Sequence, residues 1–305
     1  MTQAPPEVFP RDKKKPFHFP VVPMFPEGST PYSILAALNY LSFRKRLVDF
    51  VNPFLTMGKY ADALNGLNAK RISAAAFGRN FPLEKFLAKY TLFPVYEKVT
   101  GHTPVLDRRI RNVDQTNWHH LRFSAFLETD SHMSWCNECL DEDVQTFGMP
   151  LWKVMHQVWF IDHCPRHKTP LLTSCNHCGQ AFKQHQNCWL LPSEDCQWCG
   201  SKVTPEPEPN RCDAYWRLVR FIENCFYDDV DNPIPFSLVQ ETWHRWNTWE
   251  RRWRHFSPEW DLVAPKFFDA WRDDPLATHL RYGRQPDEHA ILTCLIGSDV
   301  MQNLN

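Results

Sequence analysis

The sequence has little glycine and lacks the motifs on which several common enzyme classes depend. Only 10 of its 305 residues are glycine, against 25 prolines and 13 tryptophans, and this balance indicates a helical chain with stiff connections. It contains no Gly-x-x-x-x-Gly-Lys-[Ser/Thr], Gly-x-Gly-x-x-Gly or His-Glu-x-x-His motif. These absences argue against an NTPase, a dinucleotide-dependent enzyme and a zinc protease.

Long hydrophobic runs are missing as well. No apolar segment reaches the roughly 20 residues that a membrane-spanning helix needs. The N-terminal stretch MTQAPPEVFPRDKKKP lacks the apolar core of a signal peptide. Because the cysteines have metal spacing and no secretory signal accompanies them, we expect a protein of the reducing cytoplasm without a membrane partner.

The sequence as a whole has no large excess of one charge, since its net charge is −1, but its charges are unevenly distributed. Residues 1–125 contain 18 Lys and Arg against 9 Asp and Glu, whereas residues 126–305 contain 16 against 26. The basic part is suited to a polyanion, and the acidic part would repel one.

Cysteine, by contrast, is abundant and regularly spaced. Four successive pairs have a two-residue gap: Cys136 and Cys139, Cys164 and His167, Cys175 and Cys178, and Cys196 and Cys199. In a tight knuckle turn this gap directs both side chains toward one ion, and two pairs complete a tetrahedral zinc site with no open position. The spacing therefore predicts two closed, structural zinc sites.

The pairing of the four knuckles is left open by spacing alone. The simplest arrangement is sequential, with the first two pairs on one ion and the last two on the other. Seventeen residues separate Cys178 from Cys196, within the range for such a site. A cross-braced arrangement would join the first pair to the third and the second to the fourth. Disulfides or unrelated core cysteines are a further alternative.

We expect a mainly α fold with four parts: an extended proline-rich arm at 1–29, a basic helix-turn-helix-like domain at 30–131, a tandem zinc-finger module with small β content at 132–204, and a helical domain at 211–305. Thr30 and Pro31 predict the start of a helix. A second helix is expected after Pro82, and a third carries apolar positions from Tyr215 to Phe226.

Two groups of residues are candidates for binding macromolecules. Phosphate contacts are expected from Arg44, Lys45, Arg46, Arg108, Arg109 and Arg111, although a solvated basic face would look the same. In the arm, candidates for partner binding are Arg11, Lys13, Lys14, Lys15, Phe17, Phe19 and Phe25. The alternatives for the arm are a plain disordered tail, or packing of Phe17 to Phe25 on the first helices.

The segment from Trp135 to Gly179 resembles the TniQ/TnsD family of transposon target-selection proteins. The resemblance rests on its Cys pairs and on a set of residues between them: Leu140, Glu142, Asp143, Trp152, His156, Pro165, Leu171 and Leu172. Asn137 departs from the proline that often follows the first cysteine in the family. The phrase from Tyr90 to Tyr96 is similar to the TnsD branch.

The resemblance implies a non-enzymatic adaptor that binds target double-stranded DNA and recruits a TnsC-like AAA+ ATPase of a TnsABC-type transposon. It also implies a bacterial, nucleoid-associated location and, for TniQ-type members, a CRISPR effector as partner. TnsD proteins usually continue further, so we expect the helical domain to be truncated or short. The competing hypotheses are a zinc-stabilised HNH-like nuclease and a zinc-finger scaffold that touches only protein.

Overall fold

The computed structural model describes residues 24–41, 69–100, 133–158, 161–182, 190–205 and 211–227. The elements in these segments are α1 (Pro31–Leu41), α3 (Ala69–Phe77), α4 (Leu83–Tyr90), α5 (Phe93–Thr100), α7 (Asn137–Phe147), the 3-10 helix η3 (Met155–Gln157) and α9 (Asp213–Tyr227). Regular β structure there is limited to isolated antiparallel bridges. The expectation of a mainly α protein with little β structure is therefore confirmed for the described part of the chain.

Helix α1 begins where its sequence predicts. The Thr30 side-chain oxygen accepts a hydrogen bond from the Ser33 backbone N–H at 3.0 Å, and the Thr30 carbonyl accepts one from Ile34 at 3.2 Å. This is an N-cap, and Pro31 follows at a position where no N–H is needed. Pro31 to Leu38 are all buried, so α1 is a central helix of the fold.

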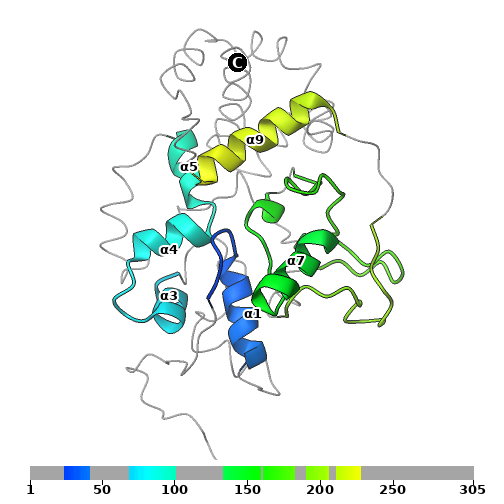
Figure 1. Cartoon of the computed structure of the whole chain (residues 1–305), viewed down its shortest axis with the longest axis horizontal. Coiled ribbons are helices and arrows are strands. Elements are labelled where there is room, and N and C mark those ends of the chain that lie inside the picture. Colours follow the sequence, from blue (N-terminus) through cyan, green and yellow to red (C-terminus); the bar gives the residue numbers. More distant parts are fainter. Residues whose placement is uncertain are drawn as a thin grey trace, which may run out of the picture.

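The remaining N-terminal helices pack in chain order, α1 on α3, α3 on α4 and α4 on α5, and α5 then contacts α9 (Figure 1). Helix α4 buries Phe86, Leu87 and Tyr90 on one face, as its apolar spacing predicts. Along α9, the expected apolar stripe is also buried, from Tyr215 through Phe226. None of the helices in the described segments has the length and apolar character needed to span a membrane.

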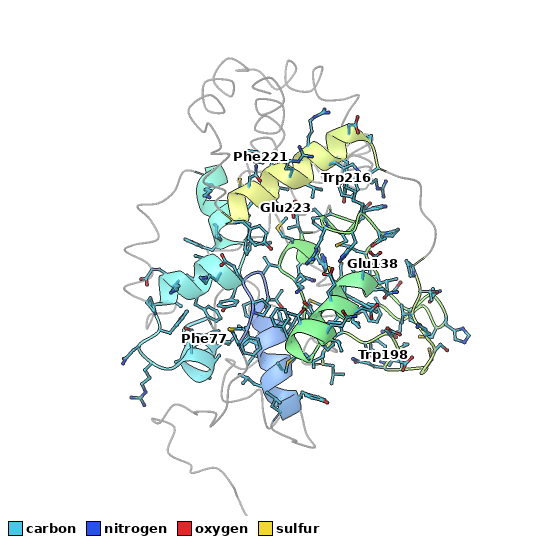
Figure 2. All side chains as sticks on the ribbon, viewed as in Figure 1. Phe77, Glu138, Trp198, Trp216, Phe221 and Glu223 are labelled. Atoms are coloured by element: carbon cyan, nitrogen blue, oxygen red, sulfur yellow. The ribbon has the colours of Figure 1, made fainter. Side chains whose placement is uncertain are left out.

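Aromatic side chains hold the turn between α3 and α4. The Phe77 ring stacks on Phe81 with centroids 4.7 Å apart and on Tyr90 at 5.3 Å. It also meets the edges of Phe86 at 6.1 Å and Phe25 at 6.2 Å. Figure 2 shows Phe77 between α1 and the α3–α4 pair. Such ring pairs contribute about 0.5–1.5 kcal/mol each beyond area burial.

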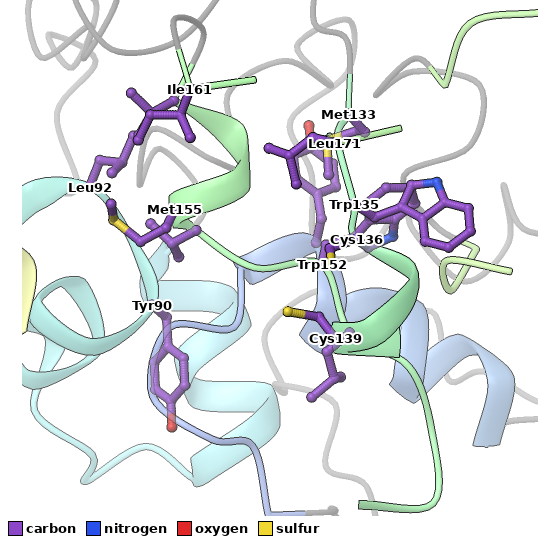
Figure 3. Close-up of a cluster of buried hydrophobic side chains, with 14 of the residues drawn as sticks. Tyr90, Leu92, Met133, Trp135, Cys136, Cys139, Trp152, Met155, Ile161 and Leu171 are labelled. Atoms are coloured by element: carbon purple, nitrogen blue, oxygen red, sulfur yellow. The ribbon is translucent and has the colours of Figure 1, made fainter. Parts of the chain in front are cut away.

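One buried cluster runs through the N-terminal helices, the cysteine-rich region and α9. Trp135 and Trp152 are its largest fully buried side chains. Figure 3 shows these tryptophans beside Cys136 and Cys139, so metal-ligand candidates lie within the core. The division into domains made from the sequence stays a prediction, but the described segments share this apolar interior.

The segment before α1 connects three parts of the fold. The Gly28 N–H donates to the Lys89 carbonyl at 2.8 Å, and the Gly28 carbonyl accepts from Val154 at 2.7 Å. Thr30 donates to the Trp152 carbonyl at 2.8 Å. Phe25 is only 5 % exposed and its carbonyl accepts a hydrogen bond from the Tyr90 hydroxyl. For Phe25 the structure thus shows the packing that the sequence left open as the alternative to partner binding.

Candidate metal centres

Two four-residue clusters are assembled in the described part of the chain. Site 1 consists of Cys136, Cys139, Cys164 and His167, and site 2 of Cys175, Cys178, Cys196 and Cys199. Within each site the four ligand atoms all lie within 4.8 Å of one another. The structure groups the pairs sequentially and not in the cross-braced order.

The spacing within each cluster fits a tetrahedral ion. With Zn–S bonds of about 2.3 Å, ligand sulfurs should lie about 3.8 Å apart, and a histidine nitrogen about 3.6 Å from each sulfur. In site 2 the Sγ–Sγ distances are 3.8 Å for Cys175–Cys199 and 3.7 Å for Cys178–Cys196. A disulfide needs about 2.05 Å. The donor sets and distances are compatible with zinc, and the cysteines are free thiols.

Site 1 meets the same test with a nitrogen ligand. His167 Nδ1 lies 3.5 Å from Cys136 Sγ, 3.4 Å from Cys139 Sγ and 3.6 Å from Cys164 Sγ. Cys139 and Cys164 are 3.6 Å apart. The nitrogen is thus roughly equidistant from the three sulfurs, as at one vertex of a tetrahedron.

Three of the four ligand pairs are carried by the same backbone turn. In each turn, the carbonyl of the first cysteine accepts a hydrogen bond from the backbone N–H four positions later. The donors are Lys168, Gly179 and Gly200, and each bond is 2.8 Å long. The donor residue has positive φ: 59° at Lys168, 70° at Gly179 and 71° at Gly200. An antiparallel bridge closes each turn, as between Ser174 and Ala181. The repeated geometry is the knuckle expected from a two-residue gap.

The first pair is built differently, and here the expected knuckle turn is wrong. Cys136 is the N-cap of α7 and its carbonyl accepts from Leu140 at 3.0 Å, so Cys139 lies in the first helical turn. A helix also places residues three apart on one face, which is why the spacing did not distinguish the two geometries. The positive end of a helix favours thiolates, so α7 would assist metal binding at site 1.

Neighbouring groups adjust the protonation of the site 1 ligands. Hydrogen bonds from Cys139 and Cys164 lower the pKa of Cys136, which favours one thiolate in the cluster. Burial acts to lower the pKa of His167, but hydrogen bonds to Cys136 and Glu142 outweigh it and raise the pKa. With Nδ1 facing the sulfurs, Nε2–H donates to Glu142 Oε1 at 3.2 Å, and Arg166 pairs with the same carboxylate at 2.9 Å. Carboxylates in this position orient a ligating histidine.

His156 is a second neighbour of site 1 that was not assigned a role from the sequence. It is 3 % exposed, and its Nε2 lies 3.9 Å from Cys139 Sγ. Burial lowers the pKa of His156 to about 4, so the ring is neutral at pH 7. Glu142 and His156 both belong to the set of residues on which the family resemblance rests, and this membership is the sequence signal for a role. Their contacts with site 1 depend on the folding of distant segments.

Site 2 lies nearer the surface than site 1. Cys175 and Cys196 are buried, whereas Cys178 and Cys199 are exposed. Trp198, between the last two ligands, is 44 % exposed and stacks on Phe182 with centroids 6.4 Å apart. Figure 2 shows Trp198 on the opposite side of α7 from α9. A bound ion at site 2 would thus be more accessible to competing ligands.

Site 1 is also joined to helix α9. The Tyr215 hydroxyl accepts hydrogen bonds from the backbone N–H groups of Asp162 and His163, both at 3.1 Å. Arg211 binds both carboxylate oxygens of Asp162. Burial raises the pKa of Tyr215, which therefore stays a neutral phenol. These contacts fix α9 against the chain that leads into Cys164.

The remaining candidate residues lie outside the described segments. This applies to Arg44, Lys45, Arg46, Arg108, Arg109 and Arg111, and in the arm to Arg11, Lys13, Lys14, Lys15, Phe17 and Phe19. Their roles stay predictions.

The described segments thus form a mainly helical protein with two four-ligand sites. Both sites are compatible with structural zinc. Residues 20–171, just under half of the chain, match the family model for TniQ, and the match supports the TniQ family for this part of the chain. The match includes the segment before α1, the N-terminal helices and all of site 1. Proteins of the TniQ family take part in transposition, where they help to target the transposon to DNA. They act as adaptors and not as enzymes. Comparison with curated proteins gives no match.

Proposed function

We propose that this protein is the DNA-targeting adaptor of a TnsABC-type transposon. It binds target double-stranded DNA and recruits a TnsC-like AAA+ ATPase, and the transposon then inserts beside that position. The observation that carries the proposal is the TniQ match over residues 20–171. The similarity of residues 90–96 to the TnsD branch supports direct recognition of the target DNA by this protein. The alternative is that a CRISPR effector partner recognises the target.

The metal sites support an adaptor over a nuclease. Zinc-dependent hydrolysis needs a coordination position for water or substrate. Each site here offers four protein ligands with tetrahedral spacing, so both ions would be fully coordinated. Bound in this way, two zinc ions would stabilise the fold around Trp135 and the knuckles, and would supply no reactive water.

Separate surfaces serve DNA and the ATPase in this proposal. The phosphates are contacted by Arg44, Lys45, Arg46, Arg108, Arg109 and Arg111. The basic cluster Arg11 to Lys15 and the adjoining Phe17 and Phe19 bind acidic and apolar groups of the ATPase. Such a protein works at the bacterial nucleoid.

The test is capture of a TnsC-like ATPase by the zinc-loaded full chain, with and without ATP and duplex DNA. We expect capture that increases when both are present. Deletion of residues 1–16 should leave both metal sites intact and reduce capture. Absence of capture under all four conditions would refute ATPase recruitment, and undiminished capture by the deletion would remove the arm from the proposal.

Two further measurements separate the competing functions. Nicking of duplex DNA that depends on a divalent metal would favour a nuclease and contradict the adaptor. Duplex affinity that falls steeply as salt rises is expected of a protein that neutralises phosphates. A protein-only scaffold would show no such affinity.

A further inference from the structure

The α3–α4 pair has the form of a helix-turn-helix. Helix α3 ends at Phe77, and residues 78–81 with the N-cap Pro82 lead into α4. Gly78 has φ of 89° and donates to the Ala74 carbonyl at 3.1 Å, and Phe81 donates to the Gly78 carbonyl at 3.2 Å. In DNA-binding pairs of this form, the second helix enters the major groove and the turn lies near the phosphates.

The two faces of α4 differ sharply. Phe86, Leu87 and Tyr90 point into the core. Glu84 and Lys85 are exposed, and on a helix with 3.6 residues per turn Ala88 lies on the same outward face. Since Ala88 has a minimal side chain, the backbone of α4 can approach another surface closely at this point.

We propose that the outward face of α4 and the preceding turn form a DNA-contact surface, in which Arg79 and Lys85 bind phosphates and Asn80 contacts the backbone or a base edge. This inference rests on the proposed function and deepens it, since none of these residues is among the candidates chosen from the sequence. Arg79, Asn80 and Lys85 are all exposed.

Charge favours duplex DNA as the occupant of this face. It belongs to the part of the chain that is rich in Lys and Arg, whereas residues 126–305 are acidic. Arg79 and Lys85 supply two cations within seven positions, without an ion pair to an acidic side chain among the described residues. Lys89 is different because its ammonium is held by Glu27 at 2.8 Å, so we do not count it as a contact.

Glu84 provides a test of opposite sign. It is exposed in the first turn of α4, next to Lys85, where its carboxylate would repel a phosphate. Its replacement by glutamine should therefore strengthen binding, whereas loss of the neighbouring cations should weaken it. A general effect on folding would not produce these opposite directions.

The experiment measures duplex affinity of the zinc-loaded full chain over a series of salt concentrations. We compare wild type, the double variant Arg79→Gln/Lys85→Gln, and Glu84→Gln. Lys202→Gln is the control for loss of one positive charge elsewhere, since Lys202 is exposed, pairs with Glu194 and lies in the acidic part of the chain. Thermal unfolding and metal content establish that each variant is folded.

The double variant should bind about tenfold more weakly, and the slope of log affinity against log salt should decrease by about two units, one for each lost contact. Glu84→Gln should bind more tightly, and Lys202→Gln should match wild type. If wild type binds DNA and the double variant is unchanged in affinity and slope, this inference is overturned and the proposed function stands. Loss of ATPase capture without loss of DNA binding would make the face a protein-docking surface and also overturn it. If wild type shows no salt-dependent affinity, both proposals are wrong.

Discussion

Replacement of Tyr215 by phenylalanine should loosen the joint between site 1 and α9. Tyr215 is 1 % exposed, and its hydroxyl accepts the backbone N–H groups of both Asp162 and His163. Phenylalanine keeps the ring contacts with Trp216 at 5.1 Å and with His163 at 6.0 Å. The substitution therefore removes hydrogen bonds and leaves the packing in place.

The cost follows from the burial of the two donors. A buried N–H that loses its acceptor costs about 1–3 kcal/mol. His163 is 2 % exposed, so its N–H has no access to water and carries the full cost. The Asp162 side chain is 46 % exposed, so water can replace part of the loss there. We expect the free energy of unfolding to fall by about 2–3 kcal/mol in total.

The assay is denaturant unfolding of the metal-loaded protein, combined with hydrogen exchange at the Asp162 and His163 amides. Tyr40→Phe is the control, because Tyr40 is 65 % exposed and its hydroxyl is accessible to water. Both amides should exchange faster in Tyr215→Phe, whereas the control should stay within about 0.5 kcal/mol of wild type. Unchanged unfolding and unchanged exchange at both amides would refute the reasoning.

Three further outcomes are expected. Because Cys178 and Cys199 are exposed, a chelator should remove metal from site 2 before site 1, and a chromogenic assay should show two phases; a single phase would contradict the difference in burial. Glu142→Gln should weaken metal binding at site 1 by about tenfold to a hundredfold, because His167 Nε2 loses its carboxylate partner. A competition titration measures this change, and an unchanged affinity would show that Glu142 does not support the histidine ligand. Gly28→Ala should lower the free energy of unfolding by at least about 1–2 kcal/mol, because Gly28 has φ of 85° and a Cβ there would lie 2.9 Å from the Tyr227 hydroxyl. If adding Tyr227→Phe to this variant recovers none of the lost stability, steric contact with the hydroxyl is not the cause.

Local features of the chain were predictable because their causes lie within a few residues. The Thr30 cap, the apolar face of α4 and the three knuckle turns all depend on contacts three to five positions apart. The grouping of the eight ligands into two sites agrees with sequential pairing, the simplest arrangement, although spacing alone left the cross-braced one open. The candidate DNA and arm residues outside the described segments gain no support from the fold.

Features that depend on distant partners were not predictable. Nothing near Cys136 distinguishes a helix N-terminus from a knuckle, because both geometries place Cys139 on the same side. Gly28 and Phe25 look like part of a proline-rich arm, and their place in the fold is set by Lys89, Tyr90 and Val154, far away in the sequence. Long-range contacts of this kind leave no periodic signal in the segment itself.

The ligand composition of the two sites has a consequence for how the molecule approaches DNA. Each thiolate carries a negative charge, so three cysteines with a neutral histidine, or four cysteines, outweigh the double positive charge of one zinc ion. Metal loading would therefore add negative charge to a region that is already acidic, and leave the N-terminal region basic. Metal loading would thus oppose contact between the cysteine-rich region and the phosphates of a duplex, most strongly at site 2, where four thiolates would surround one ion.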